Sequence, residues 1–264
     1  MYEKMSRQRI RLMTKHMGFA ILLFLTVFSF AMTVRANEST GSDAVVTMIQ
    51  GTARIYGKGS TTGRLLKKGD TLKKEQEVKV AAKSRIEIRF PDGTVMRLSE
   101  KSDLKMNELS FNKQTDDKNV KVNLSIGKLW AKVKKLTTPD SSVEVRTSNA
   151  VAGVRGTVYR VNVEEDKSAL VKVYDGSVYV ANPPRDTSTE SNKATAPHEV
   201  SGPHAVAPPY HEVSVEEWTA IVKAMQQISI SPQGVPSKPE DFDPKADADD
   251  WVKWNQERDK DAQF

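Results

Sequence analysis

Apolar and polar side chains alternate along the chain in short runs between residues 44 and 180. Residues 85–90 place Ile86, Ile88 and Phe90 on one side of an extended chain, and residues 119–126 repeat this pattern. Successive side chains of a β-strand point to opposite faces, so a period of two indicates strands with one buried and one wet face. The alternation predicts an all-β domain over residues 44–180.

Turn signals separate these runs. Asp92-Gly93 and Asp175-Gly176 each lie between two apolar stretches. Glycine adopts positive φ without a Cβ clash, so such dipeptides favour the tight turns that reverse an antiparallel chain. We therefore expect an antiparallel β-sandwich or roll. The recurring glycines also suit a β-solenoid-like fold, which stays open as the alternative.

The composition changes after residue 180. Residues 181–213 are rich in proline and poor in apolar side chains, which is typical of a linker. Residues 214–230 begin with a capping-box pattern, and their apolar residues are spaced as on one face of a helix: Trp218, Ile221, Val222 and Met225. We expect an amphipathic helix there.

Residues 231–264 are predicted to form a second linker and a short tail helix that carries Trp251 and Trp254. This helix is too short to be stable alone. Aromatic anchors are common at interfaces, so Trp218, Trp251 and Trp254 are candidate partner contacts. We expect Trp218 to dock its helix on the domain's own sheet, whereas Trp251 and Trp254 can equally dock there or on another protein.

Residues 1–36 have the order of a secretory signal peptide: a basic start, an apolar run and small residues before a cleavage site after Ala36. The uncharged run of 18 residues, 17–34, also reaches the lower limit for spanning a bilayer. The alternative is an uncleaved membrane anchor. Both readings place the β domain outside the inner membrane, in a periplasmic or secreted protein or one anchored facing the periplasm.

The charge is unevenly distributed. Residues 37–136 carry 21 basic and 12 acidic residues, whereas residues 137–264 carry 13 and 21. We interpret this as a basic β face and an acidic tail, which attract each other or two different partners. A solvated surface is the simpler alternative. The basic residues lack an aromatic platform, so we expect no nucleic-acid binding.

The residues that support catalysis or metal binding are sparse. The chain has no cysteine, and of its four histidines none lies in the β domain: His16, His198, His204 and His211. This excludes thiolate catalysis, cysteine zinc sites and a Ser-His-Asp triad within that domain. Carboxylates are scattered, without an evident acid–base pair. We expect no enzyme activity, no catalytic residues, no metal site and no cofactor.

Two stretches resemble the FecR domain family. The first is residues 90–98, Phe-Pro-Asp-Gly-Thr-Val-Met-Arg-Leu. The second, more specific, is residues 147–161, which contain the core Ala-Val-Ala-Gly-Val-Arg-Gly-Thr followed by an aromatic strand. Residues 175–178, Asp-Gly-Ser-Val, are similar to the family's closing strand. Together these anchors cover residues 44–180.

The resemblance implies an all-β envelope domain that binds or senses a partner, either an envelope protein or a cell-wall or surface polymer. The oligomeric state stays open. The alternative is a single-pass inner-membrane regulator related to ferric-siderophore sensing. We do not carry over control of a sigma factor, since only about 17 residues precede the apolar run.

The motif residues have a structural and a functional interpretation. In the structural one, Gly153 and Gly156 permit a tight bend, Arg155 pairs with a carboxylate, and Thr157 starts the next strand. In the functional one, the arginine and the glycine N–H groups bind an anion. We favour the structural interpretation, and we assign Asp92, Gly93, Asp175 and Gly176 to turns.

Overall fold

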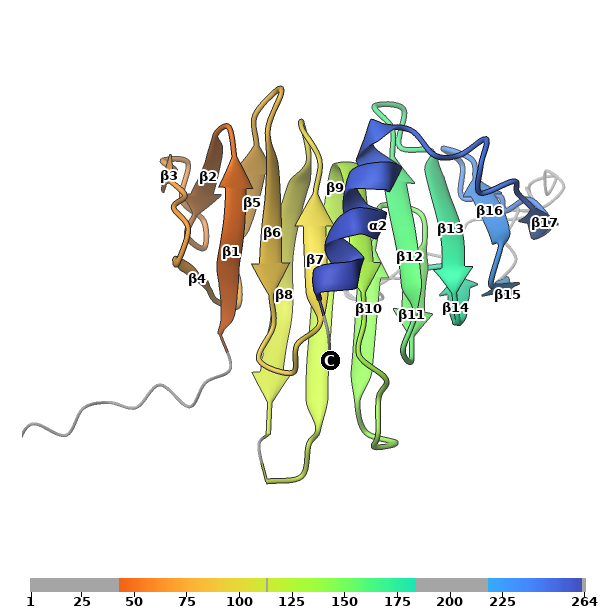
Figure 1. Ribbon diagram of the computed structural model, residues 1–264, viewed down its shortest axis with the longest axis horizontal. Helices are drawn as coiled ribbons and strands as arrows, with labels where there is room; N and C mark the ends of the chain where they lie inside the picture. The colour runs from red at the N-terminus through yellow and green to blue at the C-terminus, as the bar shows by residue number, and fades with distance from the viewer. Residues whose placement is uncertain (1–42, 113, 184–217, 263–264) are drawn as a thin grey trace, which may run out of the picture. The chain divides into compact units, whose positions relative to one another are not determined.

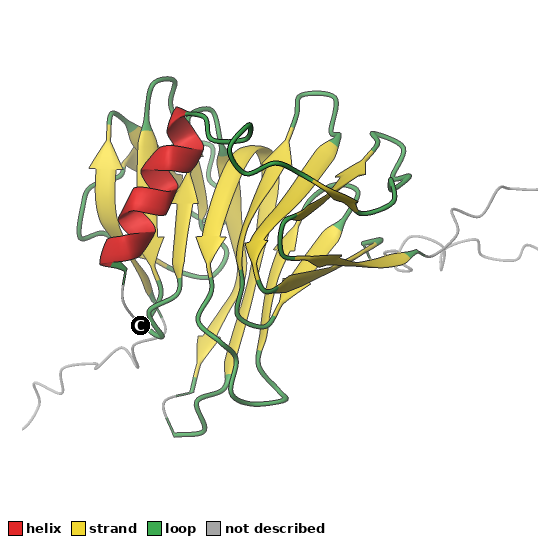
Figure 2. Cartoon of the chain, turned by 45° about the vertical axis from the view of Figure 1, so that its right-hand side comes forward, coloured by secondary structure: helices red, strands yellow, loops and turns green. Residues whose placement is uncertain are grey.

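A computed structural model describes residues 43–112, 114–183 and 218–262 of the chain. These residues are mostly β, and the one helix among them is α2 (Asp250–Asp261). The expected all-β class with a C-terminal helix is therefore confirmed. Figures 1 and 2 show two layers of strands, with α2 lying against the outer face of one of them.

Layer A is the layer that α2 covers. Its strands pair in the order β4-β1-β6-β7-β9-β12-β13-β16-β17, and every pair is antiparallel. Its strands apart from β9 are β1 (Ala44–Gln50), β4 (Thr71–Leu72), β6 (Arg85–Arg89), β7 (Val95–Leu98), β12 (Val158–Val163), β13 (Ala169–Asp175), β16 (Gln226–Ile230) and β17 (Glu240–Asp241).

Layer B packs behind layer A (Figure 1). Its strands pair in the order β3-β2-β5-β8-β9-β10-β11-β14-β15. Its strands apart from β9 are β2 (Ala53–Tyr56), β3 (Arg64–Leu65), β5 (Glu77–Val80), β8 (Asp103–Phe111), β10 (Ser142–Arg146), β11 (Val151–Val154), β14 (Ser177–Ala181) and β15 (Thr219–Lys223).

Strand β9 (Lys118–Lys132) belongs to both layers and joins them into one mixed sheet that is not closed. Its first part pairs with β8 and β10, and its last six residues pair with β12. Gly127 lies at the change of layer with φ +97°, and a Cβ there would lie 2.5 Å from Cα of Ser102. Only glycine permits this close approach and this backbone conformation.

From β6 onward, consecutive strands pair as hairpins: β6–β7, β12–β13 and β16–β17 lie in layer A, and β8–β9, β10–β11 and β14–β15 lie in layer B. Among the described strands only β9 and β10 run parallel. A solenoid would stack successive coils in parallel. The antiparallel sandwich is therefore the observed arrangement, and the solenoid alternative is wrong.

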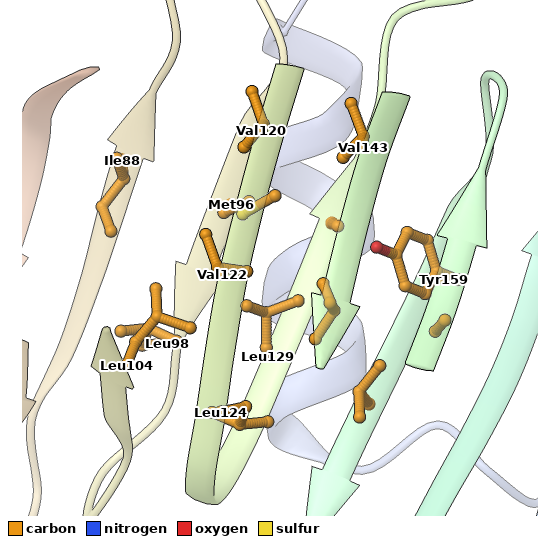
Figure 3. Packing of buried hydrophobic residues seen from close by; sticks show 14 of the residues in the cluster. Ile88, Met96, Leu98, Leu104, Val120, Val122, Leu124, Leu129, Val143 and Tyr159 are labelled. Carbon is orange, nitrogen blue, oxygen red and sulfur yellow. The ribbon is translucent and has the colours of Figure 1, made fainter. Parts of the chain in front are cut away.

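The main hydrophobic core lies between the layers (Figure 3). The alternation predicted its members correctly: Ile86 and Ile88 of β6 and Val122 and Leu124 of β9 are all 0% exposed. Removing apolar surface from water stabilises a fold by about 25 cal/mol per Å², so this core is the principal source of stability.

The helix expected at residues 214–230 is wrong over its described part. Strands β15 and β16 occupy that part as a hairpin, with Met225 in the turn at φ +63°. Val222 and Ile228 point into the core, whereas Ile221 and Met225 of the supposed helical stripe are 61% and 44% exposed. Cross-strand pairing with β13 and β14 buries alternate residues here and overrides the helical spacing.

Several expectations concern residues outside the described ranges. These are the signal peptide or anchor at residues 1–36, most of the linker at 181–213, and the capping box at 214–217. In the part of the chain that the structure describes, no helix has both the length and the apolar character to cross a bilayer.

Candidate functional site

A row of polar side chains crosses the outer face of layer A through five neighbouring strands. The strand registers place its members opposite one another in the order Glu87, Arg97, Trp130, Arg160 and Lys172. We call these five residues the cross-strand row. All but Lys172 are at most 5% exposed, and the Lys172 side chain is 12% exposed. An outer sheet face this deeply buried requires a cover.

The cover is the C-terminal segment, residues 242–262. Within it, α2 begins where the carboxylate of Asp249 accepts a hydrogen bond of 2.8 Å from the backbone N of Val252. Acidic Asp250 in the first turn and basic Arg258 in the last turn complement the helix dipole. Figure 1 shows α2 in front of the central strands of layer A, where the cross-strand row lies.

Four charged side chains form the first ionic cluster, which lies between α2 and layer A. Oε2 of Glu87 accepts hydrogen bonds of 2.8 Å from Nε of both Arg97 and Arg258. Nη1 of Arg97 donates to Oδ1 of Asp259 at 2.6 Å. Burial favours the neutral form of Glu87, but hydrogen bonds from Arg258, Arg97 and Thr47 outweigh it and lower the pKa of this carboxyl to about 2.

The C-terminal end of α2 is held by β9. Nε1 of Trp130 donates to Oδ2 of Asp259 at 3.0 Å, so both carboxylate oxygens of that residue have partners in layer A. Nζ of Lys132 donates to the backbone oxygens of Asp259 and Ala262 at 2.7 and 2.6 Å. A cation at this position satisfies helix-terminal carbonyls and complements the negative end of the dipole.

Asp247 forms the second cluster, ahead of α2. Its carboxylate accepts hydrogen bonds from Arg160 at 2.6 Å, from Lys172 at 2.7 Å and from the Tyr174 hydroxyl at 2.6 Å. Burial opposes ionisation, yet the bonds from Lys172 and Tyr174 and the charge of Arg160 hold the pKa of Asp247 below its usual range. Burial and the acceptor Asp247 raise the pKa of Tyr174.

Aromatic side chains lie between the two ionic clusters. Trp130, Tyr174, Trp251 and Val252 form a second hydrophobic cluster, separate from the main core. The ring of Trp254 stacks on Trp251 with centroids 5.2 Å apart. Three guanidinium groups also lie near the Trp254 ring, those of Arg85 at 4.9 Å, Arg258 at 5.6 Å and Arg97 at 5.9 Å.

The tryptophans named as candidate partner contacts therefore lie against the chain itself. Trp251 and Trp254 dock on layer A through α2. Trp218 precedes β15, and its Nε1 donates to the backbone oxygen of Gly234 at 2.9 Å. Trp218 also packs against the main core, although not as part of the expected helix.

The first turn motif has a structural role. Gly93 has φ +94°, and its N–H donates to the Phe90 carbonyl at 3.0 Å. Asp92 accepts from both the N–H and the hydroxyl of Thr94, at 3.0 and 2.8 Å. The Asp92 carboxylate also lies 2.9 Å from Nζ of Lys118, and both side chains are buried. Asp92 therefore joins the β6–β7 turn to the start of β9.

The other two motifs pack on each other. Gly156 has φ +109°, and a Cβ there would lie 2.7 Å from Cα of Lys135. Gly176, next to the exposed Asp175, has φ +82°, and its Cβ would lie 2.7 Å from the Gly156 oxygen. The hydroxyl of Thr157 donates to the Ser177 carbonyl at 3.0 Å. Both glycines are thus required by the approach of two bends.

The close approach of the two bends does not depend on Arg155 or Gly153. Arg155 is exposed, and its Nη2 donates to the Thr138 carbonyl at 3.1 Å instead of pairing with the carboxylate expected from the sequence. A Cβ on Gly153 would make only an ordinary van der Waals contact, 4.0 Å from the Tyr179 carbonyl oxygen. The structure does not bring these motif residues into the cross-strand row.

Sequence reasoning missed the cross-strand row and Asp247. Polar residues at alternate positions of a strand are expected to face water, so nothing local marks Glu87, Arg97 or Arg160 as buried. The signal that pointed to them was the contrast between the basic and the acidic part of the chain. The attraction inferred from that contrast is seen where Asp259 meets Arg97, whereas Asp247 and Arg160 both belong to the acidic part.

A cavity of about 500 Å³ lies beside the N-terminal end of α2. Trp251 forms part of its wall, and charged residues of both signs also line it, among them Arg85, Lys101, Glu100 and Glu164. In the ranges that the structure describes, three or more potential ligands do not gather anywhere in a way that would hold a metal ion.

A comparison with protein families agrees with these motifs. The FecR protein family matches residues 76–179. Two crystal structures of a proposed anti-sigma factor from Parabacteroides distasonis ATCC 8503 align with TM-scores of 0.43 and 0.42, at 17% and 16% identity. The alignments cover 64% of this chain and 61% of each of those chains. A comparison with curated proteins finds no match.

The matched range contains all three sequence motifs and all five residues of the cross-strand row, whereas the C-terminal segment lies beyond it. The resemblance of this part of the chain to the FecR family is therefore confirmed over residues 76–179.

Proposed function

We propose that this chain is a non-enzymatic binding or sensing module of the cell envelope, acting through a protein partner. Proteins with FecR domains are regulatory, and such a role rests on recognition rather than on bond-making. The observation that carries the proposal is the cross-strand row, a charged and aromatic surface that already binds an acidic helical segment through side-chain contacts.

The state of the buried carboxylates supports a non-catalytic role. A general acid or base works best with a pKa near the working pH and within reach of a substrate. Glu87 has a pKa of about 2, and the pKa of Asp247 is also lowered. Both accept hydrogen bonds from two cationic side chains. Such groups stay ionised and paired at neutral pH, which suits a docking contact better than proton transfer.

The proposed location rests on the sequence of residues 1–36. A cleaved signal peptide would release the β domain to the periplasm or the exterior, whereas an uncleaved anchor would hold it at the inner membrane. Mass spectrometry of the protein isolated from cells tests this directly. We expect a mature chain that begins at Asn37, and an intact Met1 in the membrane fraction would favour the anchored regulator instead.

Capture of partners from the envelope tests the binding role. The tagged full-length chain is cross-linked in intact cells, alongside a variant in which Arg97 is replaced by glutamine and a control in which the exposed Lys260 is replaced by alanine. We expect one defined protein whose recovery changes in Arg97→Gln and not in Lys260→Ala. Identical recovery with all three chains would refute a role of the cross-strand row.

A further inference from the structure

We infer that the outer face of layer A is a binding surface for acidic amphipathic helices, and that the C-terminal segment is its exchangeable ligand within the chain. A helix of another protein with the same chemistry would compete for this surface. This inference rests on the proposed binding function and adds the chemical nature of the partner.

The surface and its cover share a hydrophobic cluster that is separate from the main core. The main core between the layers ends, in sequence order, at Ile230, and no described residue of the C-terminal segment belongs to it. Trp251 and Val252 instead join the second cluster, with Trp130 and Tyr174. Undocking of α2 would therefore leave the packing between the two layers in place.

Two acidic anchors define the ligand. Asp247 meets Arg160 and Lys172, and Asp259 meets Arg97 and Trp130. The first anchor lies three residues before α2, and the second lies in its last turns. A matching partner would carry a carboxylate ahead of the helix, an aromatic or aliphatic pair in the first turn, and a carboxylate two turns later on the same face.

The surface holds more hydrogen-bond donors than the C-terminal segment satisfies. Nη2 of Arg97 and both Nε and Nη1 of Arg160 have no hydrogen-bond partner, although these residues are 0% and 5% exposed. A buried donor without a partner is costly. A helix with an additional carboxylate near either arginine would satisfy these donors and bind more favourably than the segment that now lies there.

The balance of forces also favours exchange. Ion pairs buried under α2 gain Coulomb energy but lose hydration, so their net contribution is small, and undocking would return the charges to water. Packing of Trp251 and Val252 therefore provides much of the binding free energy. A contact of this kind is selective, because a wrong charge is strongly penalised, and it can still be displaced.

A labelled peptide tests the inference. The peptide has the sequence of residues 245–264 and is titrated into the full-length chain and into the full-length variant Val252→Asp, with fluorescence anisotropy as the readout. Val252 is 0% exposed, so a carboxylate there should undock α2 and uncover the surface. We expect the variant to bind the peptide at least about tenfold more tightly than the wild-type chain, whose surface is occupied.

Variants of the peptide test the chemistry. Replacing both Asp247 and Asp259 by asparagine in the peptide should weaken binding about 30-fold or more, because each carboxylate meets a buried arginine. The matched control is Glu257→Gln in the peptide. The Glu257 side chain is 72% exposed and pairs with Lys260 alone, so this change should leave binding within about twofold.

A second measurement does not depend on correct folding of the Val252→Asp variant. A protease site is inserted between Pro244 and Lys245 of the full-length chain, which is cleaved after folding. We expect the labelled peptide to exchange with the cleaved segment. Failure of the peptide to bind either chain, while both keep the β-sheet circular dichroism of the wild type, would overturn the inference. A dimer that exchanges α2 between two copies and ignores the peptide would also overturn it.

These results are independent of the envelope capture. If the peptide does not bind but Arg97→Gln still alters partner recovery, the proposed function stands and the partner's chemistry is wrong. If the peptide binds but no envelope protein is recovered, the surface is real and the proposed function fails.

Discussion

Arg97 and Asp259 are separated by 162 residues in the sequence, yet Nη1 of the first lies 2.6 Å from Oδ1 of the second. The Arg97 side chain is 0% exposed and also contacts Glu87 at 2.8 Å. Two carboxylates therefore compensate one guanidinium that has no access to water. This relationship joins the C-terminal segment to layer A.

Loss of that guanidinium should be strongly destabilising. In Arg97→Ala, the carboxylates of Glu87 and Asp259 stay beneath α2 without their shared partner, which costs about 3–5 kcal/mol for a broken buried pair. Lys260→Ala is the control, because its ion pair with Glu257 is exposed and should contribute little to stability. Urea unfolding measures both, and a loss below about 1 kcal/mol in Arg97→Ala would contradict the role assigned to the cluster.

The interior of the sandwich could be predicted from the sequence because the alternation is a local property of each strand. Ile86, Ile88, Val122 and Leu124 all lie in the core, as their spacing indicated. The turns at Gly93 and Gly176 were also predictable, since both adopt positive φ. These features depend on neighbours two to four residues away.

The hairpin at residues 219–230 was mispredicted because two periods coexist in it. The spacing of Trp218, Ile221, Val222 and Met225 fits a helix, while Ile228 and Ile230 alternate as in a strand. The chain forms strands here because pairing with the edges of β13 and β14 buries Val222, Ile228 and Ile230. A sequence window contains no information about those edges.

The cross-strand row depends on registers between strands that are far apart in the sequence. Arg160 lies opposite Trp130 and Lys172 because of how β12 pairs with β9 and β13. The amphipathic pattern indicated that these positions face outward, which is correct. That a second segment would cover them was visible only as the charge contrast between the two parts of the chain.

Acid should weaken the first ionic cluster. Glu87 has a folded-state pKa of about 2 against an ordinary value of 4.5, so it favours the folded state above pH 4.5, and this contribution is lost as the pH falls toward 2. The full effect is roughly 3 kcal/mol. We expect Glu87→Gln to be less stable than wild type at pH 7 and to approach it near pH 2. Urea unfolding across pH measures this, and a constant difference would contradict it.

Ionisation of Asp103 should affect folding stability in the opposite direction to that of Glu87. Burial and the neighbouring Glu77 raise the pKa of this carboxyl from 3.8 to about 6, although Lys79 lies 3.0 Å from both carboxylates. A raised pKa means that the protonated group favours folding, so its contribution is complete below pH 3.8 and is lost as the pH rises through 6.

The variant Asp103→Asn isolates this effect. It keeps a neutral side chain at every pH, so we expect it to be more stable than wild type at pH 8, with the difference disappearing below pH 4. Thermal unfolding in matched buffers measures the difference. Lower stability of Asp103→Asn at pH 8 would show that the ion pair with Lys79 outweighs burial and the repulsion from Glu77.

Two buried tyrosines should respond differently to loss of the hydroxyl. The Tyr159 hydroxyl lies in the main core, 0% exposed and without a hydrogen-bond partner, whereas the Tyr174 hydroxyl donates to Asp247 at 2.6 Å. Tyr159→Phe should therefore be neutral or stabilising by up to about 1 kcal/mol, and Tyr174→Phe destabilising by about 1.5–3 kcal/mol. Equal losses in urea unfolding would show that Tyr159 has a partner after all.

The glycines of the FecR motif provide the sharpest test of its structural interpretation. Gly156→Ala and Gly176→Ala each place a Cβ 2.7 Å from backbone at positive φ, so we expect each to destabilise the fold by more than about 1 kcal/mol. Gly153→Ala adds a Cβ in a β-strand at an ordinary van der Waals distance from its neighbour and should be neutral or stabilising by about 0.5–1 kcal/mol. Arg155→Ala removes a single exposed hydrogen bond and should change stability by less than about 0.5 kcal/mol.

If Gly153→Ala proved as damaging as Gly156→Ala, strain at positive φ would not explain the motif. A motif needed for anion binding would instead show Arg155→Ala losing a bound anion with its stability intact, which titration with inorganic phosphate would detect.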